Sequence, residues 1–251
     1  MPSGSKHTRA SFFLVNIVIG DVDKRLPYRN TLVKQLTDFC REEGVPAFPV
    51  VLIDADMEHA MSALLQTVSV GPVRPNLAIF GWTDESDRVA AAVRQYRIAR
   101  DMGMSLVLIH PGYFAAYPGP KRIDVWWRGL QNGNLMGLLA YMLTCNPEWA
   151  DTHLRLLRQV AKPEAREGTA DELRQLLATA RIQAEAVVIV DEAPFEEILD
   201  RESADAACVI LGFEVPEQDE ADRWHQHLSG LCQESPTSIF VCSIGDEDML
   251  A

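Results

Sequence analysis

The 251-residue sequence is poor in cysteine, in basic charge and in long apolar runs. Its five cysteines form no CxxC pair; they are Cys40, Cys145, Cys208, Cys232 and Cys242. This odd, scattered set favours buried, reduced thiols of a cytosolic protein over a disulfide or zinc framework. His225 and His227 form an HxH without a Cys or carboxylate at ligand spacing, which favours a solvated helix face over a metal site.

Basic residues are scarce, because 23 Lys+Arg stand against 36 Asp+Glu and give a net charge of −13. A protein that binds a phosphate backbone needs a basic stripe, so nucleic acid is not an expected partner. The charge is also uneven along the chain. Residues 1–125 hold 14 Lys+Arg and 13 Asp+Glu, a net of +1, whereas residues 126–251 hold 9 and 23, a net of −14.

Apolar runs such as Leu135–Leu143 are far shorter than the roughly 18–20 residues that a membrane-crossing helix needs. Phe12–Ile19 has no small-residue cleavage pattern behind it, so it does not resemble a signal peptide. Met1–Ser5 resembles a cloning remnant. We therefore expect residues 1–11 to be a tag remnant and N-terminal linker, and the chain to be an excised part of a longer protein.

What the sequence does contain is a regular alternation of apolar runs and amphipathic segments. The expected strands are 12–19, 48–53, 77–80, 106–109, 123–127, 154–160, 186–190, 207–211 and 239–242. The expected helices are 27–44, 56–68, 84–102, 132–145, 169–180, 194–200 and 220–232. A Thr169/Glu172 capping box is expected to open the fifth of these helices. Strands that alternate with helices over short turns predict an α/β fold with a doubly wound parallel sheet.

Two stretches indicate an internal repeat. Leu77–Trp82 aligns with Cys208–Phe213, and Leu106–Ile109 aligns with Ile239–Cys242 at nearly the same offset along the chain. We therefore expect two pseudo-repeated, Rossmann-like halves packed together, residues 12–117 and 118–251, with Pro118-Gly119-Pro120 near their junction.

No motif for catalysis, cofactor binding or metal binding is recognisable. The first strand ends in Gly20-Asp21-Val22-Asp23, whose two carboxylates would repel a phosphate. The segment Gly129–Gly133 is the nearest match to a phosphate nest, and a tight turn with an Asn cap explains it more simply. Asp21 and His110 could form an acid–base pair at a switch crevice, although loop-capping roles are favoured. Ser243 lacks a nucleophile-elbow context. We therefore expect no enzyme and no cofactor.

Two apolar features call for an explanation. Asn134–Leu143 is apolar around nearly its whole circumference, which predicts a helix that is covered on two sides. Trp126 and Trp127 are adjacent in a strand and should point to opposite faces of the sheet. Either both are core residues, or part of this segment lies in an interface between halves or protomers. The candidate interface residues are Trp126, Trp127, Leu138, Tyr141 and Met142.

At these residues the sequence resembles a known family. An Ile123–Trp127 (IDVWW) strand, a glycine-containing turn, a leucine-rich helix and a Trp-containing segment at Asn146–Trp149 follow one another. This order is similar to the C-terminal cytoplasmic domain of prokaryotic cation-chloride cotransporters. Three weaker matches are Arg74–Trp82, Phe195–Ile198 and the segment from Ser203–Asp205 into Val209–Gly212.

The resemblance implies a regulatory, dimerising domain on the cytoplasmic side of the membrane, in a transporter that moves Na⁺ or K⁺ with Cl⁻. Its halves would resemble universal stress proteins. Its partners would be a second copy and the transmembrane part of its own transporter, without direct lipid insertion. The near-neutral half, with Lys6 and Arg9, would join the membrane part, and the acidic half would project away from the leaflet.

The resemblance also has departures. The long phosphorylation-bearing insertions of animal members are absent, and the G-x2-G-x9-G-[ST] nucleotide loop of universal stress proteins has no counterpart. Two alternatives stay open: a free-standing tandem universal-stress-like protein that binds a small ligand or nucleotide, and the cytosolic tail of a related amino-acid permease.

Overall fold

The computed structural model describes residues 12–68, 75–112, 121–149, 151–232 and 237–245. The chain divides into two compact units, residues 1–76 and 77–251. None of the helices in the described ranges is long and apolar enough to cross a membrane.

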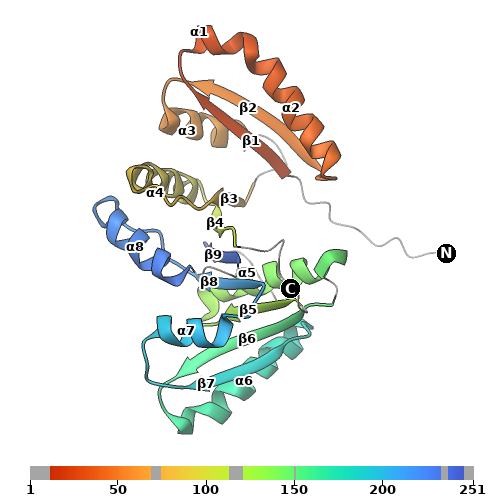
Figure 1. Cartoon of the computed structure of the whole chain (residues 1–251), viewed down its shortest axis with the longest axis vertical. Helices are drawn as coiled ribbons and strands as arrows, with labels where there is room; N and C mark the ends of the chain where they lie inside the picture. The colour runs from red at the N-terminus through yellow and green to blue at the C-terminus, as the bar shows by residue number, and fades with distance from the viewer. Residues whose placement is uncertain (1–11, 69–74, 113–120, 150, 233–236, 246–251) are drawn as a thin grey trace, which may run out of the picture. The chain divides into compact units, whose positions relative to one another are not determined.

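The first unit is a two-stranded parallel ribbon flanked by helices. Strand β1 (Phe12–Ile19) pairs with β2 (Ala47–Asp54), and the connection holds α1 (Val22–Arg25), a 3₁₀ turn (Leu26–Tyr28) and α2 (Arg29–Glu42). Helix α3 (Met57–Val68) follows β2. Figure 1 shows α2 and α3 on opposite sides of the two strands. The buried stripe of α3, spaced for one helix face, is Ala60, Met61, Leu64 and Leu65.

The second unit is built on a seven-stranded sheet in the order β3-β4-β9-β8-β5-β6-β7. The strands are β3 (Leu77–Gly81), β4 (Ser105–His110), β5 (Arg122–Trp126), β6 (His153–Val160), β7 (Glu185–Val190), β8 (Cys208–Gly212) and β9 (Thr237–Cys242). Neighbouring strands are parallel, except that β4 and β9 are antiparallel. The predicted α/β fold is confirmed, with a sheet that is parallel-dominated.

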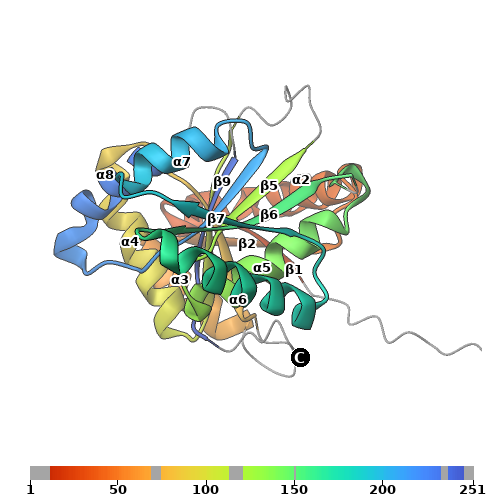
Figure 2. The same ribbon diagram turned by 90° about the horizontal axis from the view of Figure 1, so that it is seen from below.

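Helices cover both faces of this sheet. They are α4 (Ser86–Asp101), α5 (Leu130–Thr144), α6 (Arg166–Ala180), α7 (Phe195–Ser203) and α8 (Ala221–Leu231), with 3₁₀ turns at Pro147–Trp149, Pro163–Ala165 and Gln218–Glu220. Figure 2 shows α5 and α6 on one side of β5–β7 and α7 on the other. The core between α5, α6 and the sheet includes Val125, Trp127, Leu135, Leu156, Leu173 and Ile210.

The strand registers in the second unit have an internal two-fold symmetry. Phe80 pairs with Leu108 in one parallel pair, and Leu211 pairs with Phe240 in the other. Leu108 and Phe240 are therefore equivalent in the repeat, and they also face each other across the antiparallel β4–β9 pair. The same registers make Leu106 equivalent to Ser238 in the repeat. The predicted alignment of Leu106 with Ile239 is therefore wrong by one residue.

The two compact units do not coincide with the two predicted halves. The expected boundary at 117/118 falls within the second unit, because β4 and β9 share one hydrogen-bonded sheet. The expected junction Pro118-Gly119-Pro120 and the expected tag remnant lie outside the described residues.

Two local predictions are wrong. Thr169 is not an N-cap, because the Pro163–Ala165 turn starts the helical path earlier and α6 begins at Arg166. Gly129–Gly133 is not a tight turn with an Asn cap, because α5 is already helical from Leu130. Asn132 therefore projects from a helix, where its amide is available for contacts outside α5.

Candidate functional site

The strand order reverses between β5 and β8. The side chain of Asn132 lies at the carboxyl ends of the strands next to this reversal. Its Nδ2 donates to the carbonyl oxygen of Phe213 (3.0 Å), and its Oδ1 accepts the N–H of Ser243 (2.9 Å). A Cβ on Gly212 would lie 3.0 Å from Asn132 Nδ2, so the amide packs directly on the end of β8. Ligands of doubly wound sheets bind at such a reversal. Here the chain's own amide ties α5 to β8 and β9.

Close packing of Trp127 on Gly133 fixes the start of α5. A Cβ on Gly133 would lie 2.4 Å from the Trp127 ring, which is closer than any real contact. The ring therefore lies against the helix backbone at a position that admits no side chain. The aromatic pair of the IDVWW strand thus sets the approach of α5 to the sheet.

A buried carboxylate lies on the other face of the same strand. Asp124 is 0% exposed and receives a two-point contact from Arg155, whose Nε and Nη2 donate over 2.8 and 2.7 Å. The Ser203 hydroxyl donates to Asp124 Oδ2 over 2.8 Å, and the Trp126 indole N–H donates to Ser203 Oγ over 3.1 Å. Arg122 lies 3.3 Å from Asp124. Buried charges that are paired in this way fix geometry, because loss of one partner is costly.

This network joins β5, β6 and α7. Arg122 and Arg155 also donate to the carbonyl oxygen of Glu202, close to the end of α7. The hydrogen bond to Asp124 raises the pKa of Arg155 above its usual value. Burial, with a smaller contribution from Asp124, raises the pKa of the neighbouring Cys208 thiol to about 12. The site is therefore a buried, hydrogen-bonded structural centre with an inert thiol beside it.

A second polar–aromatic cluster surrounds Trp82, just after β3. The His225 ring stacks on Trp82 with centroids 4.8 Å apart, and His225 Nε2 lies 2.7 Å from the Thr83 carbonyl oxygen. The prediction of a solvated HxH face is therefore wrong for His225. His227 is exposed, 3.6 Å from Glu196. The described residues contain no group of three His, Cys, Asp or Glu side chains placed to hold a metal.

Asp21 and His110, the candidate crevice pair, lie in different units. Asp21 caps α1, since its carboxylate accepts the N–H groups of Asp23 and Lys24. His110 ends β4, with Nε2 3.9 Å from Asp84. The favoured loop-capping role is confirmed for Asp21.

The candidate interface residues fall into two groups. Trp126 and Trp127 are buried on opposite faces of the sheet, which confirms their interpretation as core residues. Leu138 is half-buried, whereas Tyr141 and Met142 are 45% and 50% exposed on α5. The expected second cover of α5 is therefore not supplied by the described part of this chain. The surface formed by Leu138, Tyr141 and Met142 is named the α5 face below.

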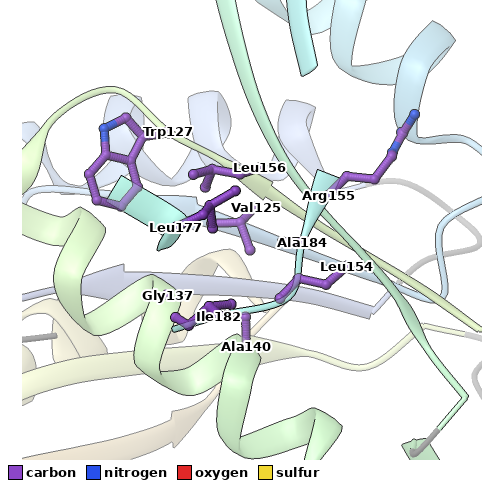
Figure 3. A pocket seen from close by; sticks show the side chains of 10 residues that line it. All are labelled: Val125, Trp127, Gly137, Ala140, Leu154, Arg155, Leu156, Leu177, Ile182 and Ala184. Carbon is purple, nitrogen blue, oxygen red and sulfur yellow. The ribbon is translucent and has the colours of Figure 1, made fainter. Parts of the chain in front are cut away.

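None of the five cysteines forms a disulfide bond. Cys145 is exposed, so the prediction of buried thiols is wrong at that position. A cavity of about 10 Å³ lies beneath α5 (Figure 3), lined mostly by apolar residues. Its lining is Val125, Trp127, Gly137, Ala140, Leu154, Arg155, Leu156, Leu177, Ile182 and Ala184. It holds about one water at most, so it is not a ligand pocket.

Sequence reasoning missed Asn132, Arg155 and Ser203. One signal was available, because Asp124 stands within an otherwise apolar strand and a buried carboxylate needs a cationic partner. The partner could not be identified from spacing, since Arg155 is 31 residues away and reaches Asp124 through β5–β6 pairing.

The geometry first defines a class of fold: a parallel-dominated α/β sheet, similar to that of universal stress proteins, in which the side chain of Asn132 bonds to the residues that follow β8 and β9. A universal stress protein from Archaeoglobus fulgidus matches with a TM-score of 0.62 at 9% identity, over 95% of this chain and 86% of that one.

The particular relationship follows from three further comparisons. The cytoplasmic domain of a prokaryotic cation chloride cotransporter matches with a TM-score of 0.66 and 17% identity, over 97% of this chain and 89% of that one. Residues 110–200 match the family model of solute carrier family 12. Potassium/chloride cotransporter 3 of Caenorhabditis elegans is 22% identical over 216 residues, which cover 84% of this chain and 19% of that protein. The predicted resemblance to a cation-chloride cotransporter cytoplasmic domain is confirmed, and the chain spans about a fifth of that relative's length.

Proposed function

We propose that this chain is a non-catalytic regulatory and dimerisation domain, on the cytosolic side of a secondary transporter that moves Na⁺ or K⁺ together with Cl⁻. The observation that carries the proposal is the similarity to a cotransporter cytoplasmic domain along nearly the whole chain, together with the family match at residues 110–200. That segment includes the IDVWW strand, α5 and the Asp124–Arg155 pair.

The α5 face supports the dimerisation part of the proposal. Tyr141 and Met142 lie in the last turn of a helix whose other side is packed into the core. Large exposed apolar side chains on such a helix are typical of protein interfaces, and Tyr and Met are among the residue types enriched there. A second copy of α5 would supply the cover that the sequence leads one to expect.

The bonding and burial of the polar side chains and thiols described above support a non-catalytic role. Asn132 is committed to Phe213 and Ser243, and Asp124 is committed to Arg155 and Ser203. The Cys208 and Cys232 thiols have their pKa values raised to about 12, mainly by burial. These groups hold the fold together and present no activated nucleophile.

Sedimentation equilibrium of the 251-residue chain tests the dimer. We expect a reversible dimer at micromolar concentration and a monomer for the Tyr141→Glu/Met142→Glu double variant. Gln131→Glu is the matched control, because it adds a charge at another exposed position of the same helix and should leave the dimer intact. A strict monomer at all concentrations would contradict the dimerisation claim.

The second candidate is a free-standing tandem universal-stress-like protein that binds a nucleotide, and the observation in its favour is the fold match to a universal stress protein. Calorimetric titration with ATP separates the two candidates. We expect no heat of binding at high ATP concentration, because Gly212-Phe213-Glu214 offers no second glycine and adds a carboxylate where a phosphate would lie. The cytosolic tail of an amino-acid permease stays a third candidate. The sequence of the membrane-spanning part would distinguish a permease from a cotransporter.

A further inference from the structure

The first unit carries a surface segment, Asp21–Arg29, in which apolar and basic side chains are interleaved. It comprises the N-cap Asp21, α1, the following 3₁₀ turn and Arg29, the first residue of α2, and every residue in it is exposed. Val22, Leu26 and Tyr28 are 42%, 53% and 62% exposed. Single exposed apolar side chains are common on any protein, but three of them in one short segment call for an explanation.

The local structure holds these side chains in place. The Asp21 carboxylate accepts the N–H groups of Asp23 (3.1 Å) and Lys24 (3.4 Å), which caps the turn. The N–H of Leu26 bonds to the carbonyl oxygen of Val22, so these two residues share one side of the turn. Pro27 then restricts the backbone before Tyr28.

Three cations lie among the apolar side chains: Lys24, Arg25 and Arg29. Lys24 lies 3.2 Å from Asp21 Oδ2 in a largely exposed pair, which is a weak interaction. Arg29 donates from Nε to the carbonyl oxygen of Val51 (3.2 Å), which anchors a guanidinium that has five N–H donors in all. With Asp21 and Asp23 included, the segment has a net charge of +1.

This combination matches the headgroup region of an anionic bilayer. Lys and Arg are attracted to anionic headgroups, Tyr is enriched at the membrane–water boundary, and exposed aliphatic side chains lose water there. An acidic protein surface would match the cations but would leave Leu26 and Tyr28 without a reason for their exposure. A purely apolar partner would leave the cations without one.

We propose that Asp21–Arg29 docks on the surface of an anionic lipid bilayer, with its cations on the headgroups and Leu26 and Tyr28 at the interface. The proposal rests on the proposed function for the nearness of the membrane, and it adds which surface of the chain faces the lipid. The contact lies at headgroup depth and places no helix in the hydrocarbon, as the expected absence of direct lipid insertion requires.

Co-sedimentation of the 251-residue chain with vesicles tests the proposal. We expect binding to phosphatidylcholine vesicles that contain phosphatidylserine, little binding to phosphatidylcholine alone, and weakening by added salt. Lys24→Gln/Arg25→Gln should weaken binding by about fivefold per removed cation. Leu26→Ser/Tyr28→Ser should weaken it at unchanged charge. Lys34→Gln and Leu130→Ser are the matched controls, since they remove an exposed cation and an exposed apolar residue elsewhere.

Each outcome decides the proposal. Binding that depends on phosphatidylserine and is lost in both segment variants, but kept in both controls, supports it when circular dichroism shows that all variants are folded. Absence of wild-type binding, or equal binding by all variants, overturns it. Competition by soluble phosphoserine with no loss in Leu26→Ser/Tyr28→Ser would indicate a headgroup site without bilayer contact, which also overturns it. The dimer measurement is independent of lipid, so failure of this proposal is distinguishable from failure of the proposed function.

Discussion

Replacing Gly133 by alanine tests the central packing contact of the chain. An added Cβ would lie 2.4, 2.5 and 2.8 Å from three atoms of the Trp127 ring, so the ring or α5 must move. Overpacking of this kind costs about 1–3 kcal/mol. Alanine in place of glycine within a helix returns about 1 kcal/mol through propensity. We therefore expect Gly133→Ala to lower the free energy of unfolding by up to about 2 kcal/mol, as the difference of these two effects.

Gly168→Ala supplies the matched control for this prediction. Gly168 also lies within a helix, α6, and a Cβ there would meet no atom within 4 Å. The control should therefore raise the free energy of unfolding by about 0.5–1 kcal/mol. Urea unfolding followed by circular dichroism measures both variants, and Trp127→Leu in the Gly133→Ala background should recover part of the loss. Equal stabilisation by Gly133→Ala and Gly168→Ala would refute the packing argument.

Three further predictions concern the Asp124–Arg155 pair, the loss of stability at low pH and the reactivity of the thiols. Asp124→Ala should lower the free energy of unfolding by about 3–5 kcal/mol, because it leaves the Arg155 guanidinium buried and unpaired. In urea unfolding, the double variant Asp124→Leu/Arg155→Met should lose clearly less stability than Asp124→Ala. An equal loss in the two variants would contradict the account. The Ala193 N–H, with the Arg201 side chain, lowers the pKa of Asp191 below its usual 3.8 in the folded state, so its contribution to stability is present above 3.8 and is lost as pH falls through the lowered value. In acid titrations, the stability of Asp191→Asn should therefore fall less steeply below pH 4 than that of the wild type. Parallel stability curves for the variant and the wild type would refute this prediction. A thiol reagent at neutral pH should modify Cys145 rapidly, and Cys208 and Cys232 only on unfolding, because burial raises the pKa of both latter thiols to about 12; Cys145→Ser should abolish the fast phase.

Much of the fold could be predicted because each element carries its own periodicity. Phe12–Ile19 is apolar except for Asn16 and ends in β-branched residues, and the strand has these same bounds. The stripe of α3 likewise follows from a 3.6-residue period. The antiparallel β4–β9 pair could not be predicted, because no local pattern states which strand lies next to which. Its reversal of direction is a consequence of the two-fold relation between the repeats.

The candidate site was predictable only in part. Strand alternation predicts that Trp126 and Trp127 point to opposite faces of the sheet, and the structure places them so. The contacts of Asn132 depend on where β8 and β9 end in space, and no spacing in the sequence encodes them. Tyr141 and Met142 were recognisable as unusual because α5 lacks a polar stripe, and the structure identifies which side of that helix is open.

The genomic reading frame upstream of Lys6 tests the central claim most directly. If this chain is the cytosolic domain of a secondary transporter, the frame should continue upstream into several apolar segments of about 20 residues each, long enough to cross a bilayer. A start codon with no apolar segments before it would contradict the transporter account.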